Sequence, residues 1–334
     1  MSHRHLTVYD REVIALGQAK GWNQQQIASA AGVSQATISR ELVRNSGGQE
    51  YRPLQAHVMA RQRRMQAHSR RLRKLDQPEL LDFVQQGLRS YWSPEQIAGR
   101  WRRHRRRSPK AVRITAATIY AWIWQAKAGG ETWHEYLRHP RRRGRRHKRK
   151  GLDLRGIIPN RVPMDQRPAA VDRKERPGDW ESDTLVGGQR KGAIATHVER
   201  LSQYLVMAQV GSRNWRLYNQ ATHEAFLRHD AMMPLPRHTT TVDNGQEFRG
   251  HQALGWQLGL QVYFAPPHQP WQRGLNEQVN GLIRQFLPKG SDLRVITQEQ
   301  LRRIEHLLNN RPRKTLRYQT PLEVLRKHLY ASQI

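Results

Sequence analysis

The chain has 334 residues, and its 58 Lys and Arg against 27 Asp and Glu give a formal net charge of +31. The absence of cysteine excludes disulfides, iron–sulfur clusters and cysteine-based zinc sites, and no apolar run approaches the roughly 18 residues that span a bilayer. Since the N-terminus also lacks the apolar run of a secretory signal, we expect a soluble intracellular protein of two or three domains.

The positive charge is concentrated in the first half of the chain. Residues 1–150 carry a net charge of +22 and residues 151–334 a net charge of +9. A merely solvated surface and an anionic membrane are the alternatives to nucleic acid. No lipidation signal supports a membrane, so we expect a nucleic-acid partner and no membrane contact. The Asp and Glu residues of the second half would repel such a polyanion, so their presence there calls for an explanation.

Residues 7–45 read as three short helices. Thr7, Asn23 and Ser34 are the expected N-caps, the second helix covering residues 24–30 and the third residues 35 to about 44. In the tight turn between them, Gly32 permits a positive φ, and Ile38 is the expected buried anchor of the last helix. This spacing is typical of a helix-turn-helix.

The exposed face of the third helix carries side chains that reach bases or phosphates. An ordinary helical hairpin is the alternative, and the net charge favours DNA binding. The expected DNA contacts on this helix are Gln35, Thr37, Ser39, Arg40 and Arg44.

A basic helical stretch over residues 51–75 reads either as a phosphate-tracking helix or as a solvated linker. After it, Ser93-Pro94 and Thr115 start two further helices. The stretch between these helices, Arg102–Arg113, holds seven basic residues, and we interpret the unit as a second helix-turn-helix with a long basic turn. Trp122 and Trp124 are expected in its core.

Residues 138–150 hold nine Lys and Arg in thirteen positions. Like charges prevent such a run from folding on itself, so we expect an extended linker that becomes ordered on phosphate, with a solvated tail as the alternative. The predicted DNA contacts in this run are Arg141, Arg142, Arg143, Arg145 and Arg146.

From residue 179 onward the hydrophobic period changes. Strands are predicted over 183–188, 192–198, 203–210, 239–242 and 260–264, with helices over 218–227, 251–258 and 275–286 and further helices in 297–330. Three strands, helix, strand, helix, strand, helix is the order of a ribonuclease-H-like α/β domain. The predicted fold class is therefore multidomain, with an all-α helix-turn-helix N-terminal half and a ribonuclease-H-like domain.

Three acidic residues lie at or next to the predicted strands and helices of this domain. Asp183 lies at the first strand, Asp243 follows the fourth, and Glu277 lies in the first turn of the helix after a loop rich in Pro, His and Trp. In the ribonuclease-H-like topology the first and fourth strands are neighbours, so the three acids are expected to converge. Clustered carboxylates repel one another and repel phosphate, and Mg²⁺ removes both difficulties because it prefers oxygen ligands. Two such ions stabilise the attacking and leaving oxygens of phosphoryl transfer.

The chain resembles the DDE transposases of bacterial insertion sequences, of the IS-thirty type, over nearly its whole length. The motifs that carry the resemblance are Ser39-Arg40-Glu41-Leu42, Trp92-Ser93-Pro94-Glu95-Gln96-Ile97, Gly178-Asp179-Trp180-Glu181-Ser182-Asp183, Asp243-Asn244-Gly245-Gln246-Glu247-Phe248, the block from Trp271 to Leu282, and Arg311-Pro312-Arg313-Lys314. Ser182 stands where the family pattern has Gly, and Leu275 where it has Thr; neither departure removes a carboxylate.

The resemblance implies that Asp183, Asp243 and Glu277 are the catalytic residues and bind two Mg²⁺ ions, for which Mn²⁺ substitutes. It also implies a retroviral-integrase-like catalytic domain. The implied activity is binding of terminal inverted repeats in double-stranded DNA, followed by strand cleavage and strand transfer into target DNA in the bacterial cytoplasm, at the nucleoid. Joining two ends implies a homodimer or a higher homo-oligomer. The alternatives are a transposase-derived transcriptional regulator without cleavage activity and a plain nuclease.

Several neighbours of the three acids have two interpretations each. Glu181 is either an acid that supports the site or half of a structural salt bridge, and Glu247 is a weaker competitor of Asp243. Asn276 and Asn280 are expected to orient Glu277 or to contact DNA. Residues expected to hold the DNA backbone, with solvated positions as the alternative, are Arg273, Arg284 and Lys289, and His268 lies either at the scissile phosphate or in loop packing.

The predicted domains follow the composition. They are a helix-turn-helix domain over residues 1–50, a basic helical linker over 51–76, a second helix-turn-helix domain over 77–137, a basic linker over 138–172 and the catalytic domain with its C-terminal helices over 173–334.

Overall fold

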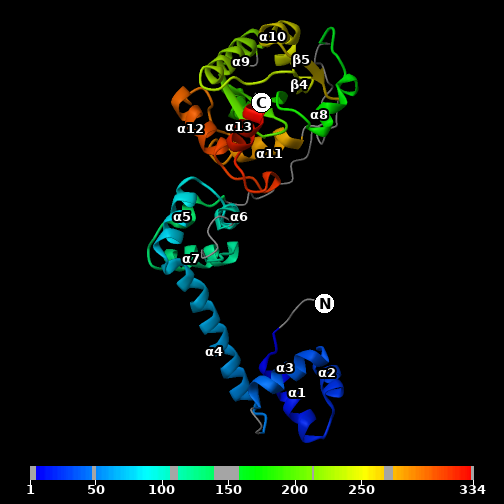
Figure 1. Ribbon diagram of the computed structural model, residues 1–334, viewed down its shortest axis with the longest axis vertical. Helices are drawn as coiled ribbons and strands as arrows, with labels where there is room; N and C mark the ends of the chain where they lie inside the picture. The colour runs from blue at the N-terminus through cyan, green and yellow to red at the C-terminus, as the bar shows by residue number, and fades with distance from the viewer. Residues whose placement is uncertain are drawn as a thin grey trace. The chain divides into compact units, whose positions relative to one another are not determined.

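The computed structural model describes residues 5–46, 50–105, 112–138, 158–212, 214–266 and 274–331. The chain divides into two compact units, Met1–Leu81 and Asp82–Ile334 (Figure 1). The first unit contains α1 (Val8–Ala19), α2 (Gln24–Ala31), α3 (Gln35–Asn45), α4 (Pro53–Leu72) and the 3₁₀ turn η1 (Arg73–Asp76).

The first three helices confirm the predicted helix-turn-helix. The Thr7 and Asn23 side chains accept hydrogen bonds from the backbone in capping boxes, and Gly32 adopts φ 62° at the turn. Ile38 is fully buried, in one cluster with Ile14 and Ile27 of the preceding helices. Ser34 occupies the N-cap of α3 as predicted, but its side chain bonds to the Thr37 hydroxyl in place of the backbone.

A buried ion pair closes the back of this small core. The Arg11 Nε donates to Glu41 Oε1 at 2.6 Å, and the Tyr51 hydroxyl donates to the same oxygen at 3.1 Å. Because α1 and α3 are tied together in this way, the exposed face of α3 is held in one orientation on its unit. Burial, together with the Glu41 charge, raises the pKa of Tyr51 above its usual range.

Three helices follow η1 in the chain: α5 (Pro78–Arg89), α6 (Pro94–Arg105) and α7 (Ala116–Ala128). The boundary between the two units falls within α5. α6 and α7 begin at the predicted residues, and Ile97 and Ile119 are fully buried. The core assignment of Trp124 is wrong: its side chain is 53% exposed. α7 is apolar on nearly all sides, so its sequence does not reveal which face its neighbours cover.

The second unit is built on a five-stranded sheet with the order β3-β2-β1-β4-β5. Its strands are β1 (Asp179–Val186), β2 (Ala193–Glu199), β3 (Leu205–Val210), β4 (Thr239–Val242) and β5 (Gln261–Phe264). β1, β2 and β3 pair antiparallel, and β1, β4 and β5 pair parallel. The predicted ribonuclease-H-like topology is confirmed.

Helices cover both faces of the sheet (Figure 1). α9 (Trp215–Asp230), α10 (His251–Leu258) and α13 (Pro321–Ala331) contribute to one core with Trp180 and Phe226, and α11 (Gly274–Ile283) and α12 (Gln298–Asn309) contribute to the other with Leu185 and Ile283. The shorter elements are α8 (Ala169–Arg173), η2 (Trp133–Tyr136), η3 (Met164–Gln166), η4 (Gly188–Arg190), η5 (Gln246–Phe248) and η7 (Lys314–Leu316).

β1 begins four residues earlier than the hydrophobic pattern predicts. The additional residues, Asp179 to Ser182, are mostly polar yet buried, because partners from distant segments satisfy them. Thr239 Oγ1 donates to Asp179 Oδ1 at 2.8 Å. Ser182 lies 2.7 Å from His197 Nδ1 and 2.8 Å from Thr240 Oγ1, so it links β1 to both neighbouring strands.

Candidate active site

The parallel pairing of β1 with β4 brings two of the three predicted acids to neighbouring positions. Glu181 opposes Thr241 in the last recorded pair of the ladder, and the same register continued by two residues opposes Asp183 with Asp243. β4 ends at Val242, directly before Asp243. Side chains alternate along a strand, so Glu181 and Asp183 share one face of the sheet.

α11 covers this face and binds Asp183 directly. The Asn280 Nδ2 donates to Asp183 Oδ2 at 2.8 Å, and the Asn280 Oδ1 accepts from the Thr196 hydroxyl of β2 at 3.2 Å. The Asn280 side-chain amide is therefore held in one orientation by Asp183 of β1 and Thr196 of β2. Asn280 is 8% exposed, so the expected DNA contact is wrong for this residue, and it holds a carboxylate other than Glu277.

Glu181 forms a structural salt bridge, the second of its two predicted interpretations. One carboxylate oxygen pairs with the buried Arg200 guanidinium. The other accepts from the backbone N–H of Asn276 at 3.2 Å, in the first turn of α11. Glu181 therefore anchors the turn of the helix that carries Glu277. Asn276 itself is 1% exposed and so is not a DNA contact.

Asp243 lies in a crowded turn. Its Oδ1 accepts the Gly245 N–H at 2.8 Å, and a Cβ on Gly245 would lie 2.6 Å from Glu247 Oε2 and 2.9 Å from Asp243 Oδ1. A side chain at this position would therefore displace the Asp243 and Glu247 carboxylates from the Gly245 backbone. Glu247 is 2% exposed and lies closer to the site than its weak sequence signal indicates.

The pKa of the buried Tyr218, on α9, responds to the negative charge of the nearby carboxylates. Burial raises the pKa of its hydroxyl far above the usual value, and the negative charges of Glu247, Asp183 and Asp243 raise it further. These three carboxylates thus lie within electrostatic range of one side chain. Sequence reasoning did not single out Tyr218.

Glu277 lies in the first turn of α11 and is exposed. It is one helical turn before Asn280, so the helix that binds Asp183 also carries the third predicted acid. Within the described ranges, however, no three His, Asp or Glu side chains gather closely enough to hold a metal ion. The structure places Asp183 on β1 and Asp243 directly after the adjacent strand β4, and does not bring Glu277 into a common cluster with them.

The donor chemistry of these acids fits a divalent cation. Each of the three offers carboxylate oxygens, the ligands that Mg²⁺ prefers. The negative charges around the Gly245 turn and Tyr218 repel one another unless a cation lies among them.

The predicted DNA contacts of α3 lie on its outer surface. Gln35, Arg40 and Arg44 are exposed, and Thr37 and Ser39 are half-buried. Two of these side chains already hold local partners: Gln35 donates to Gln24 at 2.6 Å, and the Arg40 Nε donates to the Ala36 carbonyl at 2.9 Å. Arg284 and Lys289, also expected to hold the DNA backbone, line a basic pocket beside the end of β1. Seven other predicted residues lie outside the described part of the chain: Arg141, Arg142, Arg143, Arg145, Arg146, Arg273 and His268.

No helix in the described part of the chain has the length and apolar character needed to cross a membrane.

The chain was compared with family models, with curated proteins and with solved structures. Residues 2–45 match a family model described as a helix-turn-helix domain. The chain is 36% identical to the transposase for insertion sequence element IS4351 of Bacteroides fragilis, over 96% of this chain and 95% of that protein. It is 37% identical to the transposase InsI for insertion sequence element IS30A of Escherichia coli (strain K12), over 97% of this chain and 84% of that protein.

The catalytic core domain of BIV integrase is a more distant likeness, with 18% identity and a TM-score of 0.35 over 47% of this chain and 98% of that chain.

Proposed function

The chain belongs to the IS-thirty (IS30) family of insertion-sequence transposases, and we propose that it binds the terminal inverted repeats of its own element, cleaves the DNA there and joins the freed 3′-OH to target DNA. The observation that carries this proposal is the register of β1 and β4, whose continuation opposes Asp183 with Asp243. Both cleavage and joining are phosphoryl transfers at one site, with Asp183, Asp243 and Glu277 as the catalytic residues.

Two Mg²⁺ ions, or Mn²⁺ in their place, would be held by Asp183, Asp243 and Glu277. Such ions supply a water of lowered pKa and stabilise the attacking and leaving oxygens. The protein's own contribution is positioning. Asn280 fixes the Asp183 carboxylate by a 2.8 Å hydrogen bond, and Glu181 fixes the first turn of α11 through the Asn276 N–H.

The helix-turn-helix of the first unit would select the DNA. Gln35, Thr37, Ser39, Arg40 and Arg44 are the proposed base and phosphate contacts on α3. The domain division proposed from the sequence assigns residues 1–50 and 77–137 to end recognition and residues 173–334 to chemistry. The basic run of residues 138–150 would add phosphate contacts. Pairing two ends requires at least a homodimer, and the DNA substrate places the work at the bacterial nucleoid.

The test is a cleavage and joining assay with the full chain. The substrate is a duplex bearing the terminal inverted repeat read from the DNA that flanks the gene, with Mg²⁺ as the metal. Asp183→Asn, Asp243→Asn and Glu277→Gln should each abolish cleavage while binding of the same duplex persists. Glu299→Gln is the matched control, since it removes an exposed carboxylate at the start of α12 that is not assigned to metal.

Three results would revise the proposal. Normal cleavage by one of the three variants removes that residue from the catalytic set. Binding without cleavage by the unaltered chain identifies a DNA-binding regulator. Cutting of any duplex irrespective of its ends identifies a nonspecific nuclease.

A further inference from the structure

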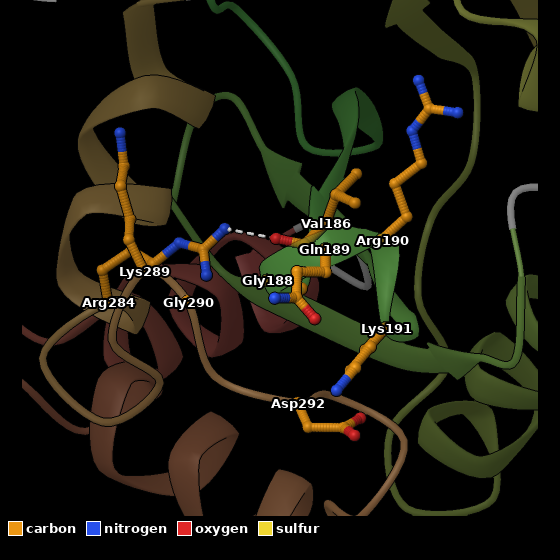
Figure 2. A pocket seen from close by; sticks show the side chains of 10 residues that line it. Val186, Gly188, Gln189, Arg190, Lys191, Arg284, Lys289, Gly290 and Asp292 are labelled. Carbon is orange, nitrogen blue, oxygen red and sulfur yellow. Dashed lines mark hydrogen bonds between the residues drawn. The ribbon is translucent and has the colours of Figure 1, made fainter.

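A basic pocket of about 790 Å³ lies beside the β1–β2 turn, and none of the three candidate catalytic acids lines it (Figure 2). One wall is the segment from Val186 to Lys191, and the other is the segment that follows α11, from Arg284 to Asp292. The two walls are about a hundred residues apart in the sequence. Their meeting is a product of the tertiary fold.

The pocket carries an excess of positive charge. Arg190, Lys191, Arg284 and Lys289 line it, against a single acid, Asp292. The Asp292 carboxylate is already paired with Arg294, at 2.6 Å from its Nη2, and this pairing lowers the pKa of Asp292 to about 2. Within the described residues, neither Lys191 nor Lys289 forms an ion pair within 4 Å or a side-chain hydrogen bond, although the Lys191 charge helps to lower the pKa of Asp292. Both ammonium groups can therefore still donate to an anion.

The walls are held in a fixed shape by close backbone contact. A Cβ on Gly188 would lie 2.2 Å from the Gly290 carbonyl oxygen, so only glycine allows the two segments to approach. Gln189 and Arg190 both adopt positive φ, at 51° and 61°, a conformation that non-glycine residues keep only where their surroundings enforce it. The Arg284 guanidinium donates to the Val186 carbonyl at 3.1 Å and closes the wall (Figure 2).

Two elements lead from the candidate catalytic acids to this pocket. Val186 follows Asp183 by three residues on β1, which is about 10 Å along an extended strand. Arg284 follows Glu277 by seven residues at the end of α11, which is also about 10 Å along a helix. At about 3.4 Å per nucleotide, this separation corresponds to about three nucleotides of one DNA strand.

We propose that this pocket binds the DNA backbone through Lys191, Lys289 and Arg190, at phosphates about three nucleotides from the scissile one. The inference rests on the proposed function for the identity of the scissile phosphate. The ligand is a phosphodiester in either case, and its source is either the element end or the target DNA. The pocket thereby sets how far a strand extends past the catalytic acids.

The first test measures the salt dependence of binding. The full chain, with Lys191→Gln and Lys289→Gln combined, is titrated onto a fluorescent duplex bearing the terminal inverted repeat at several salt concentrations. Each phosphate contact contributes about 0.9 to the slope of log K against log salt, so the slope should fall by about 2. Arg303→Gln with Lys327→Gln, which removes the same charge from exposed positions on α12 and α13, should leave the slope unchanged.

Lys191→Arg with Lys289→Arg should retain the slope, because the charge is kept. An unchanged slope in the glutamine pair, or an equal fall in the control pair, overturns the proposal. This readout needs no cleavage. A chain whose Asp183→Asn variant still cleaves would overturn the catalytic assignment while leaving the pocket test intact.

The second test locates the source of the phosphate. Single uncharged methylphosphonate linkages are placed at successive positions either in the element end or in a target duplex, and cleavage and joining are measured. A neutral linkage about three nucleotides from the reacting phosphate should slow the reaction of the unaltered chain, and should add little in the Lys191→Gln, Lys289→Gln chain. The arm that shows this non-additivity identifies the strand in the pocket, and full additivity at every position in both arms refutes the proposal.

Discussion

Removing the Glu181 charge should destabilise the second unit because it leaves the Arg200 guanidinium buried. The two side chains are 3% and 8% exposed. The other contacts of Arg200 are weak substitutes. Its Nε donates to the Val171 carbonyl at 3.1 Å, and its Nη2 lies 3.8 Å from Asp172, whose side chain is 59% exposed and well screened by water.

The expected cost follows from this burial. Breaking a buried pair by neutralising one partner costs about 3–5 kcal/mol, so Glu181→Gln should lower the free energy of unfolding by about 3 kcal/mol. For a unit of this size the melting temperature should fall by about 10 °C. Arg200→Met should cost a similar amount, since it leaves a buried carboxylate.

A double-mutant cycle separates this interaction from general damage. In Glu181→Gln with Arg200→Met no buried charge remains, so the double variant should be more stable than either single variant. Thermal unfolding of the full chain, followed by near-ultraviolet circular dichroism, supplies the four values. Costs that simply add, or single variants that each lose less than about 1 kcal/mol, would refute the reasoning.

The same cycle has a functional arm. In Glu181→Gln with Arg200→Met the side-chain amide oxygen at position 181 still accepts the Asn276 N–H, so this double variant should retain most of its cleavage rate. Glu181→Leu with Arg200→Met is equally uncharged but lacks that acceptor, and its cleavage should be slower because the first turn of α11 loses its anchor. Equal cleavage by the two double variants would show that Glu181 does not position the helix.

Three further predictions concern the site, the sheet and the DNA-reading helix. Asn280→Leu removes a hydrogen bond to the Asp183 carboxylate worth about 1.5–3 kcal/mol, so cleavage should fall by about 10- to 100-fold while binding of the end duplex is unchanged; an unaffected rate contradicts the positioning role. Burial lowers the pKa of His197 to about 3, below its value of about 6.5 in the unfolded chain, so this residue stabilises the fold above about pH 6.5 and the contribution is lost as the pH falls towards 3. Between pH 7 and pH 5 that loss is about 2 kcal/mol, measurable by urea unfolding, and His197→Asn should remove this part of the pH dependence. Arg44→Gln should weaken binding of the end duplex and lower its salt slope by about 1, without changing the rate of cleavage at saturating protein; an unchanged slope would remove Arg44 from the DNA contacts.

Local sequence signals predicted most element boundaries in this chain. Thr7 and Asn23 cap their helices as expected, and the strand at Thr239–Val242 and the helix at His251–Leu258 have the predicted limits. These features depend on neighbouring residues, through capping hydrogen bonds, β-branched runs and apolar periodicity. The order of the elements was enough to predict the pairing of β1 with β4.

Features that depend on distant partners were not predictable in this way. The first half of β1 is polar, and it is a strand because Thr239 and Arg200 satisfy Asp179 and Glu181. Trp124 lies on a helix that is apolar on nearly all sides, so only its neighbours decide that it is exposed. The role of Asn280 likewise needs Asp183 and Thr196 in place.

The sequence by itself determined the order of helices and strands and the basic character of the chain, and it predicted three acids for phosphoryl transfer. The tertiary structure decided which partners those acids meet. It put Asp183 under the Asn280 amide, crowded Asp243 and Glu247 around Gly245, and built a basic pocket from two segments about a hundred residues apart. A buried polar group without a partner costs free energy, so the fold depends on partners that can lie anywhere in the chain.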